Sequence, residues 1–312
     1  MLTRLYTHAA CLDHDPGRLH PERPARLEAV LAAFEDPAFA ELERVEAPRA
    51  ERLQLERVHD AGYVEMVLAA VPAVGRANLD ADTTLSSGSG EAALRAAGAV
   101  CAAVAAAVKG EARHAFCAVR PPGHHAESDQ AMGFCLFNNI AVGAAEAKAQ
   151  GLDRVAVVDF DVHHGNGTQH MFERDSQVLF ASTHQWPLYP GTGAAGETGI
   201  GNVVNAPLPP LAGSAEFRQA MTDKILPAID RFRPDLIMIS AGFDAHWLDP
   251  LGSLNFTEED YAWITEELCL LADRHAEGRV VSSLEGGYDL DALASSAAAH
   301  VKALMDWGKG SR

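Results

Sequence analysis

The sequence predicts an α/β protein, built on a mostly parallel sheet with helices on both faces. Short apolar runs alternate with longer segments of helical character along all 312 residues. Runs such as Val155–Val158 are rich in β-branched residues and lack polar alternation, which is typical of strands buried on both faces. No repeat, linker or change of composition divides the chain. We therefore expect one domain over residues 1–312.

The expected strands and helices follow one another in order. Most of the expected strands are apolar runs, and short strands are expected as well at the first and fifth of these positions: Leu2–Thr7, Ala115–Val119, Val155–Val158, Val178–Thr183, Val203–Leu208, Leu236–Ser240 and Val280–Leu284. The helices occupy the longer segments between them: Ala25–Phe34, Gly62–Val71, Glu91–Val108, Asn139–Gln150, Ser214–Phe232, Thr257–His275 and Leu290–Met305. The Ser/Thr/Gly-rich segment 80–90 has no periodicity and suits the rim of a pocket.

The composition narrows the range of partners and locations. A net charge of -18 would repel nucleic acids and suits a cationic partner. Five scattered cysteines without a CxxC pair favour a reducing cytoplasm over a disulfide framework. We find no signal-peptide pattern and no apolar run of the ~20 residues that span a membrane. The Ala-rich segment 88–108 is interrupted by Glu91 and Arg95, so we expect a buried helix there.

A cluster of acids and imidazoles directly follows the apolar run Val155–Val158. Burial of such groups is unfavourable unless a metal or an opposite charge compensates for it. Side chains two positions apart on a strand share a face and lie roughly 6.5–7 Å apart. Asp161 and His163 can therefore bind one ion between them, with Asp159 one step deeper. A solvated loop is the alternative, but the buried run before it favours the metal site.

Polar residues also follow other expected strands. His124 and His125 are adjacent in a loop stiffened by Pro-Pro-Gly. Adjacent histidines in a loop sometimes have no function, but the apolar residues that follow this pair favour a catalytic role. Asp244 and Tyr288 each come after a later buried strand. Because parallel sheets bind ligands at the carboxyl ends of their strands, we expect these residues to share one site.

The acids and imidazoles at the strand ends predict a catalytic metal. Asp161, His163 and Asp244 would supply two carboxylates and one imidazole, leaving a position open for water and substrate, as catalytic zinc requires. Zinc polarises a carbonyl and lowers the pKa of water, which indicates metal-assisted hydrolysis of an amide.

The remaining polar residues fit proton transfer in such a reaction. Asp159 could orient His124, and Asn166 could orient His125. An amide partner would leave His125 less basic, in keeping with a base that works near neutral pH. Tyr288, after two glycines, could donate its hydroxyl to the carbonyl oxygen.

Seven motifs spread over nearly the whole chain resemble the zinc-dependent histone deacetylase family, specifically its class II branch and the bacterial histone deacetylase-like amidohydrolases. The motifs are HPERPARL, RPPGHHAE, GFCLFNN, VVDFDVHHGNGT, YPGTG, SAGFDAH and EGGYDL. The resemblance implies the arginase/deacetylase fold and hydrolysis of an acylated lysine side chain, which releases acetate or another acyl acid.

The resemblance also implies roles for individual residues. Zinc would be held by Asp161, His163 and Asp244. Catalysis would use His125 as general base and acid, His124 as electrostatic partner and Tyr288 as carbonyl polariser, with Asp159 and Asn166 beside the two histidines. A structural potassium ion would be bound by Asp159, Asp161, His163 and Ser182. The substrate channel would be lined by Gly133, Phe134, Tyr189 and Leu251, with Arg23 at its floor.

Related activities are possible alternatives. Arginase-like enzymes hold two manganese ions, and the motifs here lack the further carboxylates that these ions need. Acetylpolyamine amidohydrolases share the zinc site, but their eukaryotic counterpart has a gatekeeping glutamate where this chain has Leu251. A binding module without activity would have lost a metal ligand or Tyr288, and neither is lost. We expect an acyl-lysine peptide or an acetylated polyamine as substrate, no nucleic acid or membrane partner, and leave the oligomeric state open.

Overall fold

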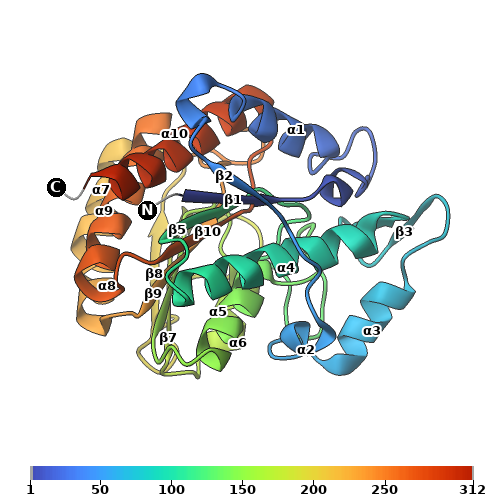
Figure 1. Cartoon of the computed structure of the whole chain (residues 1–312), viewed down its shortest axis with the longest axis horizontal. Helices are drawn as coiled ribbons and strands as arrows, with labels where there is room; N and C mark the ends of the chain where they lie inside the picture. Colours follow the sequence, from blue (N-terminus) through green and yellow to red (C-terminus); the bar gives the residue numbers. More distant parts are fainter. Residues whose placement is uncertain (1–2, 311–312) are drawn as a thin grey trace.

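The computed structural model describes residues 3–310, and its centre is an eight-stranded sheet (Figure 1). The strand order is β2-β1-β5-β10-β9-β6-β7-β8, and every neighbouring pair is parallel. The strands are β1 Thr3–Thr7, β2 Glu43–Glu46, β5 His114–Cys117, β6 Val155–Asp159, β7 Val178–Gln185, β8 Val203–Leu208, β9 Leu236–Ala241 and β10 Val280–Leu284. The predicted α/β class with a parallel sheet is confirmed, while Leu2 lies outside the described residues.

The strands with the most apolar sequences lie in the middle of the sheet. Every residue of β6, β9 and β10 is buried. A strand flanked by neighbours and covered on both faces leaves no position for an exposed side chain, which explains the unbroken apolar runs.

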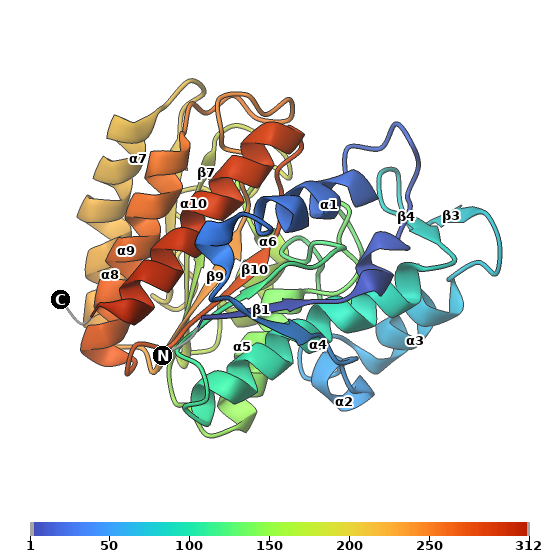
Figure 2. The ribbon, with the colours of Figure 1, turned by 45° about the horizontal axis from the view of Figure 1, so that its top comes forward.

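Helices cover both faces of the sheet. In Figures 1 and 2, α1 and α10 lie on one side of the strands and α4 and α5 on the other. The helices are α1 Pro24–Ala33, α2 Arg52–Leu55, α3 Ala61–Ala69, α4 Ser89–Val108, α5 Asn139–Ala149, α6 Asn166–Phe172, α7 Ser214–Ala220, α8 Leu226–Phe232, α9 Glu258–His275 and α10 Leu290–Lys309. Short 3₁₀ turns occur at Ala9–Leu12 and Pro37–Phe39.

The helix predicted over 214–232 is interrupted by a π-helical turn, η3 Met221–Ile225, between α7 and α8. Pro227 lies in the first turn of α8. A proline inside a helix has no N–H to donate and crowds the preceding turn, so the backbone widens locally there.

Some small elements were not predicted. The edge strand β2 has the sequence ERVE with alternating exposure, and therefore shows no apolar run. Strand β4 Thr84–Ser86, within the segment 80–90 that was predicted as a pocket rim, forms a hairpin with β3 Arg76–Asn78, which precedes that segment. The short helix α6 begins at Asn166, directly after the acid and imidazole cluster.

Helix α4 is apolar enough in composition and long enough to cross a membrane, and is the one such helix within residues 3–310. In the fold it packs against α5 and the sheet, and 67% of its most apolar window is buried. A Cβ on Gly143 of α5 would lie 2.3 Å from Val100 Cγ1, so this glycine permits the close approach of the two helices. The Ala-rich segment is thus a buried helix, as predicted.

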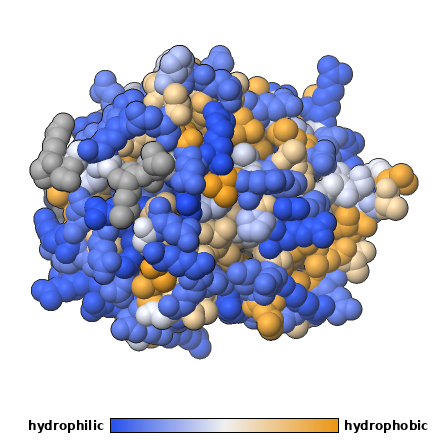
Figure 3. All heavy atoms as spheres, in the orientation of Figure 1, coloured by the Kyte–Doolittle hydropathy of each residue, from blue (hydrophilic) through white to orange (hydrophobic). Residues whose placement is uncertain are grey.

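The surface over the face of Figure 1 is mainly hydrophilic, with apolar residues in small separate groups (Figure 3). This polar exterior agrees with the excess of acidic over basic residues, 43 against 25.

Candidate active site

The predicted site residues converge at the carboxyl edge of the sheet. Asp161 and His163 follow β6, Asp244 follows β9, and Tyr288 follows β10. These three strands are adjacent, in the order β10-β9-β6. The loops after parallel neighbours leave the sheet at the same edge, so residues far apart in the sequence meet there.

Asp161, His163 and Asp244 form one compact group. One ligand atom from each residue lies within 4.8 Å of the other two. His163 Nδ1 is 3.2 Å from Asp161 Oδ1 and 3.2 Å from Asp244 Oδ2. Both carboxylates are buried. Two carboxylates and an imidazole facing one another are a donor set that suits a divalent zinc ion.

The backbone around this group is shaped for an ion. Gly286 N–H donates to Asp161 Oδ2 at 2.9 Å, and Val162 N–H donates to Asp244 Oδ1 at 2.8 Å. These bonds leave Asp161 Oδ1 and Asp244 Oδ2 directed towards the imidazole. A Cβ on Gly286 would lie only 2.1 Å from Asp244 Oδ2, so the site requires glycine there.

The electrostatics of the group also favour a bound cation. Burial and the charge on Asp161 raise the pKa of Asp244 to about 7. Burial alone would lower the pKa of His163, but hydrogen bonds to Asp161 and Asp244 raise it to about 10. The two acids therefore attract positive charge strongly, and the residues fit the metal that the sequence predicts.

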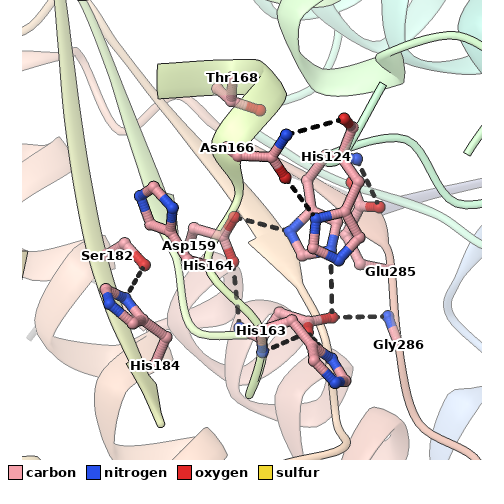
Figure 4. A network of polar contacts seen from close by, with 12 residues as sticks. His124, Asp159, His163, His164, Asn166, Thr168, Ser182, His184, Glu285 and Gly286 are labelled. Atoms are coloured by element: carbon pink, nitrogen blue, oxygen red, sulfur yellow. Dashed lines mark hydrogen bonds and ion pairs between the residues drawn. The ribbon is translucent and has the colours of Figure 1, made fainter. Parts of the chain in front are cut away.

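The two adjacent histidines have different partners (Figure 4). His124 Nδ1 is 2.9 Å from Asp159 Oδ2, and His125 Nδ1 is 2.7 Å from Asn166 Oδ1. Both pairs were predicted. Nδ1–H of each ring donates to an oxygen, which leaves Nε2 of His125 with a lone pair when that ring is neutral.

The surroundings of the two imidazoles shift their pKa values in opposite directions. Burial alone would lower the pKa of His124, but the charges of Asp161 and Asp159 hold it well above its usual range. Burial and the positive charges of His124 and His163 hold the pKa of His125 well below its usual range. Two neighbouring groups whose pKa values differ in this way are suited to different roles in one reaction.

Tyr288 lies beside a fully buried arginine that the sequence analysis did not assign. Arg26 donates to the carbonyl oxygens of Gly287 and Glu285, and its guanidinium lies 4.8 Å from the centroid of the Tyr288 ring. Burial raises the pKa of the Tyr288 hydroxyl, which keeps it protonated and able to donate a hydrogen bond.

The assignment of Arg23 to the channel floor is wrong. Arg23 is the half-buried N-cap residue of α1 and does not line the cavity. Pro24 starts the helix, so Arg23 stands outside it, whereas Arg26 lies on the buried face of the first turn. The apolar residue Leu27 beside Arg26 marks that face, and this was the signal available in the sequence.

A cavity of about 220 Å³ leads to the site. Four predicted channel residues line it together with His125, His163 and Tyr288: Gly133, Phe134, Tyr189 and Leu251. Tyr189 is 40% exposed and stands at the mouth. A Cβ on Gly133 would lie 2.4 Å from His125 Cδ2, so only glycine fits against that ring.

Two residues near the cavity were not predicted. Asp82, from the loop expected to form a rim, is part of the cavity wall. Glu285 is buried, and its Oε2 accepts from the backbone N–H groups of Gly123 and His124, at 2.6 and 3.2 Å. Glu285 thereby ties the loop of the histidine pair to the end of β10.

Two of the predicted potassium ligands lie on neighbouring strands: Asp159 is the last residue of β6, and Ser182 lies within β7. Asp159 and Ser182 are register partners between β6 and β7. Asp159 Oδ1 accepts from the backbone N–H of Asp161 at 3.1 Å, and Ser182 Oγ lies 2.9 Å from His184 Nδ1 (Figure 4).

Comparisons with known proteins agree with this arrangement. A model of the histone deacetylase domain matches residues 20–304. A probable deacetylase of Archaeoglobus fulgidus is 38% identical over 298 residues, covering 93% of this chain and 82% of the relative. A histone deacetylase-like amidohydrolase of Pseudomonas aeruginosa is 44% identical over 274 residues, covering 86% and 71%. The crystal structure of the HDA15 HD domain matches with a TM-score of 0.94 and 36% identity, covering 98% of this chain and 88% of that one. With its parallel sheet, its buried acid and imidazole cluster and these matches, the chain belongs to the histone deacetylase family.

Proposed function

We propose that this protein is a zinc-dependent lysine deacylase, which hydrolyses the amide of an acylated lysine side chain. Membership of the family makes it a hydrolase of the deacetylase and amidohydrolase kind. One observation supports the finer proposal: His163 of the metal-ligand group and the His125 imidazole line the same cavity, whose walls include Phe134 and Tyr189.

Asp161, His163 and Asp244 would hold the zinc ion. Zinc held there would supply a Lewis acid for the amide carbonyl and for the attacking water. Asp159, Asp161, His163 and Ser182 would bind a potassium ion, and the register of Asp159 with Ser182 supports this. We infer a structural role for that ion, since it would link the end of β6 and the loop after it to the neighbouring strand β7.

The chain's own residues would move the proton. His125 Nε2 takes a proton from the attacking water, because Nδ1–H is bound to Asn166 Oδ1. The same imidazole then gives the proton to the leaving amine. His124, paired with Asp159, supplies a fixed positive charge beside it. Tyr288 donates its hydroxyl to the oxygen on which negative charge develops.

The cavity walls favour an acyl-lysine substrate. Phe134, Tyr189 and Leu251 present apolar surface that suits the methylenes of a lysine side chain. An acetylated polyamine is the second candidate, and the carboxylate of Asp82 in the wall favours it, because a cationic nitrogen could pair with that group. None of the channel residues predicted from the sequence has a carboxylate, so Asp82 makes this candidate stronger than the sequence indicated.

One assay tests the proposal and its alternative together. The zinc-loaded protein is given acetyl-lysine peptides and acetylated polyamines side by side, and kcat/KM is measured for each. We expect turnover of both classes, with the higher kcat/KM for peptides. Preference for an acetylated polyamine over every peptide would replace the first candidate by the second. Absence of turnover with either class, at full zinc content, would refute the proposed function.

A further inference from the structure

Asn166 lies between the imidazole of His125 and the carboxylate of Glu127. Its Oδ1 faces His125 Nδ1 at 2.7 Å. Its Nδ2 faces three acceptors: Glu127 Oε1 at 2.5 Å, the backbone oxygen of His125 at 3.3 Å and Met132 Sδ at 3.4 Å. The side-chain amide is thus surrounded by acceptors on one side and by the imidazole on the other.

Glu127 is itself held in place from several directions. The same Oε1 lies 2.8 Å from Nδ1 of His170 on α6. The backbone oxygen of Glu127 is 2.9 Å from His59 Nδ1, and its N–H donates to Gln130 at 2.9 Å. The Glu127 side chain is only 16% exposed, whereas that of His170 is 47% exposed. A row of contacts therefore runs from an exposed histidine inwards to the active-site imidazole.

The carboxylate decides which end of the amide faces His125. The oxygen and nitrogen of an asparagine side chain have nearly the same shape, so hydrogen-bond partners select the orientation. A reversed amide would place Oδ1 against the Glu127 carboxylate and the His125 carbonyl, where like partial charges repel. It would also offer Nδ2 to His125 Nδ1, which favours a proton on Nε2. If His125 is to act as a base through a lone pair on Nε2, the Asn166 amide must keep its Oδ1 towards His125 Nδ1.

The carboxylate also strengthens the contact beyond it. Hydrogen bonds in a row polarise one another, so a charged acceptor at Nδ2 makes Oδ1 a better acceptor for the His125 N–H. We propose that Glu127 is a positioning residue for the base, which fixes the Asn166 amide and thereby the tautomer of His125. This inference rests on the proposed function, in which His125 is the base.

A double-mutant cycle tests the inference. Glu127→Gln keeps the size of the side chain but removes its charge, and Glu127→Ala removes the acceptor. We expect Glu127→Gln to lower kcat by about 3-fold and Glu127→Ala by about 10-fold, with little change in KM, since a hydrogen bond to a charged group is worth more than a neutral one. In an Asn166→Asp background, two carboxylates would face each other. There Glu127→Gln should raise kcat, because its amide can donate to Asp at position 166.

This change of sign separates positioning from a general structural role. A merely structural Glu127 would lower kcat in both backgrounds, and that result would overturn the inference. Glu173→Gln is the matched control: it removes a negative charge near His170 from a residue that forms an ion pair with Arg174, and kcat should stay unchanged. A fall in kcat as large as that of Glu127→Gln would attribute the effect to charge at long range and would also overturn the inference.

Thermal unfolding of the same variants gives a readout that does not depend on activity. Glu127→Gln should lower Tm in the natural background and raise it in the Asn166→Asp background. If the natural protein hydrolysed no substrate, the proposed function would fail, and the unfolding cycle alone would then decide whether Glu127 holds position 166. A sign change in Tm without one in kcat, in an active protein, would show a contact that does not position the base and would refute the inference.

Discussion

His124 and His125 are consecutive in the chain, and their ring centroids lie 4.0 Å apart, yet each Nδ1 faces a different kind of partner. The charges of Asp161 and Asp159 hold the pKa of His124 well above its usual range, while burial and the charges of His124 and His163 hold the pKa of His125 well below its usual range. Two cations at this distance would repel strongly, so charge on His124 helps to keep His125 a free base.

The first prediction follows from this asymmetry. His125→Ala should lower kcat/KM by ~10²–10⁴-fold, because a positioned proton-transfer group contributes that much. His124→Ala should have the smaller effect, since its contribution is mainly electrostatic. Steady-state kinetics at matched zinc content measures both. The opposite ranking would mean that the two roles are exchanged.

The second prediction concerns the metal. Asp161→Ala removes one of two buried carboxylates that face His163, so zinc content and activity should fall together. Metal analysis of the purified variant, beside its kcat, provides the check. Asp129→Ala, which removes an exposed carboxylate from the loop after the histidine pair, is the control and should keep both. Full zinc occupancy with near-natural turnover in Asp161→Ala would refute the ligand assignment.

The third prediction concerns stability. Glu22 is fully buried and accepts from Arg26 and Arg120, with His14 Nε2 3.3 Å away. Burial alone would raise the pKa of Glu22, but the charge of Arg120 and the hydrogen bond of His14 hold it well below 4.5. Glu22→Gln leaves two buried guanidinium groups without their counter-charge, which should lower the free energy of unfolding by about 3–5 kcal/mol at neutral pH.

The sign of the pH dependence is fixed by the direction of that shift. The folded state lowers the pKa of Glu22, so its carboxylate stabilises the fold fully above the ordinary value of 4.5, and this stabilisation is lost as the pH falls through the folded value. Urea unfolding at several pH values measures the difference in the free energy of unfolding between the natural protein and Glu22→Gln. This difference should decrease only below pH 4.5. A difference in the free energy of unfolding that stays constant down to the lowest pH would contradict this prediction.

The sequence predicted those features that follow from local periodicity. Asp161 and His163 were placed together because residues two apart at a strand end share a face, and the buried runs of β6, β9 and β10 were visible as apolar segments. Arg26 was missed because the choice between it and Arg23 depends on where α1 begins. Asp82 reaches the cavity from a loop that is distant in the sequence from the other site residues, and Glu127 and Asn166 are likewise far apart in the chain. No local sequence pattern predicts such contacts.

The last prediction concerns substrate preference, which depends on two side chains of the cavity wall. Leu251 and Asp82 both line the approach to the site. The backbone N–H of Leu251 is bound to Asp249 Oδ1 at 3.0 Å, and Asp249 Oδ2 also accepts from Tyr288 N–H at 2.7 Å. Position 251 is therefore fixed relative to the tyrosine, and a charged side chain there would stand at a defined distance from the bound amide.

Leu251→Glu should raise kcat/KM for acetylated polyamines and lower it for acyl-lysine peptides. A second carboxylate beside Asp82 can pair with a polyamine nitrogen that would otherwise lose its hydration unpaired, whereas the methylenes of lysine lose apolar contact. Asp82→Asn should act in the opposite direction on polyamines, and Leu251→Gln controls for size without charge. The ratio of the two kcat/KM values, measured in one buffer for all four proteins, is the quantity to compare. Equal ratios for Leu251→Glu and Leu251→Gln would show that charge at this position does not select the substrate.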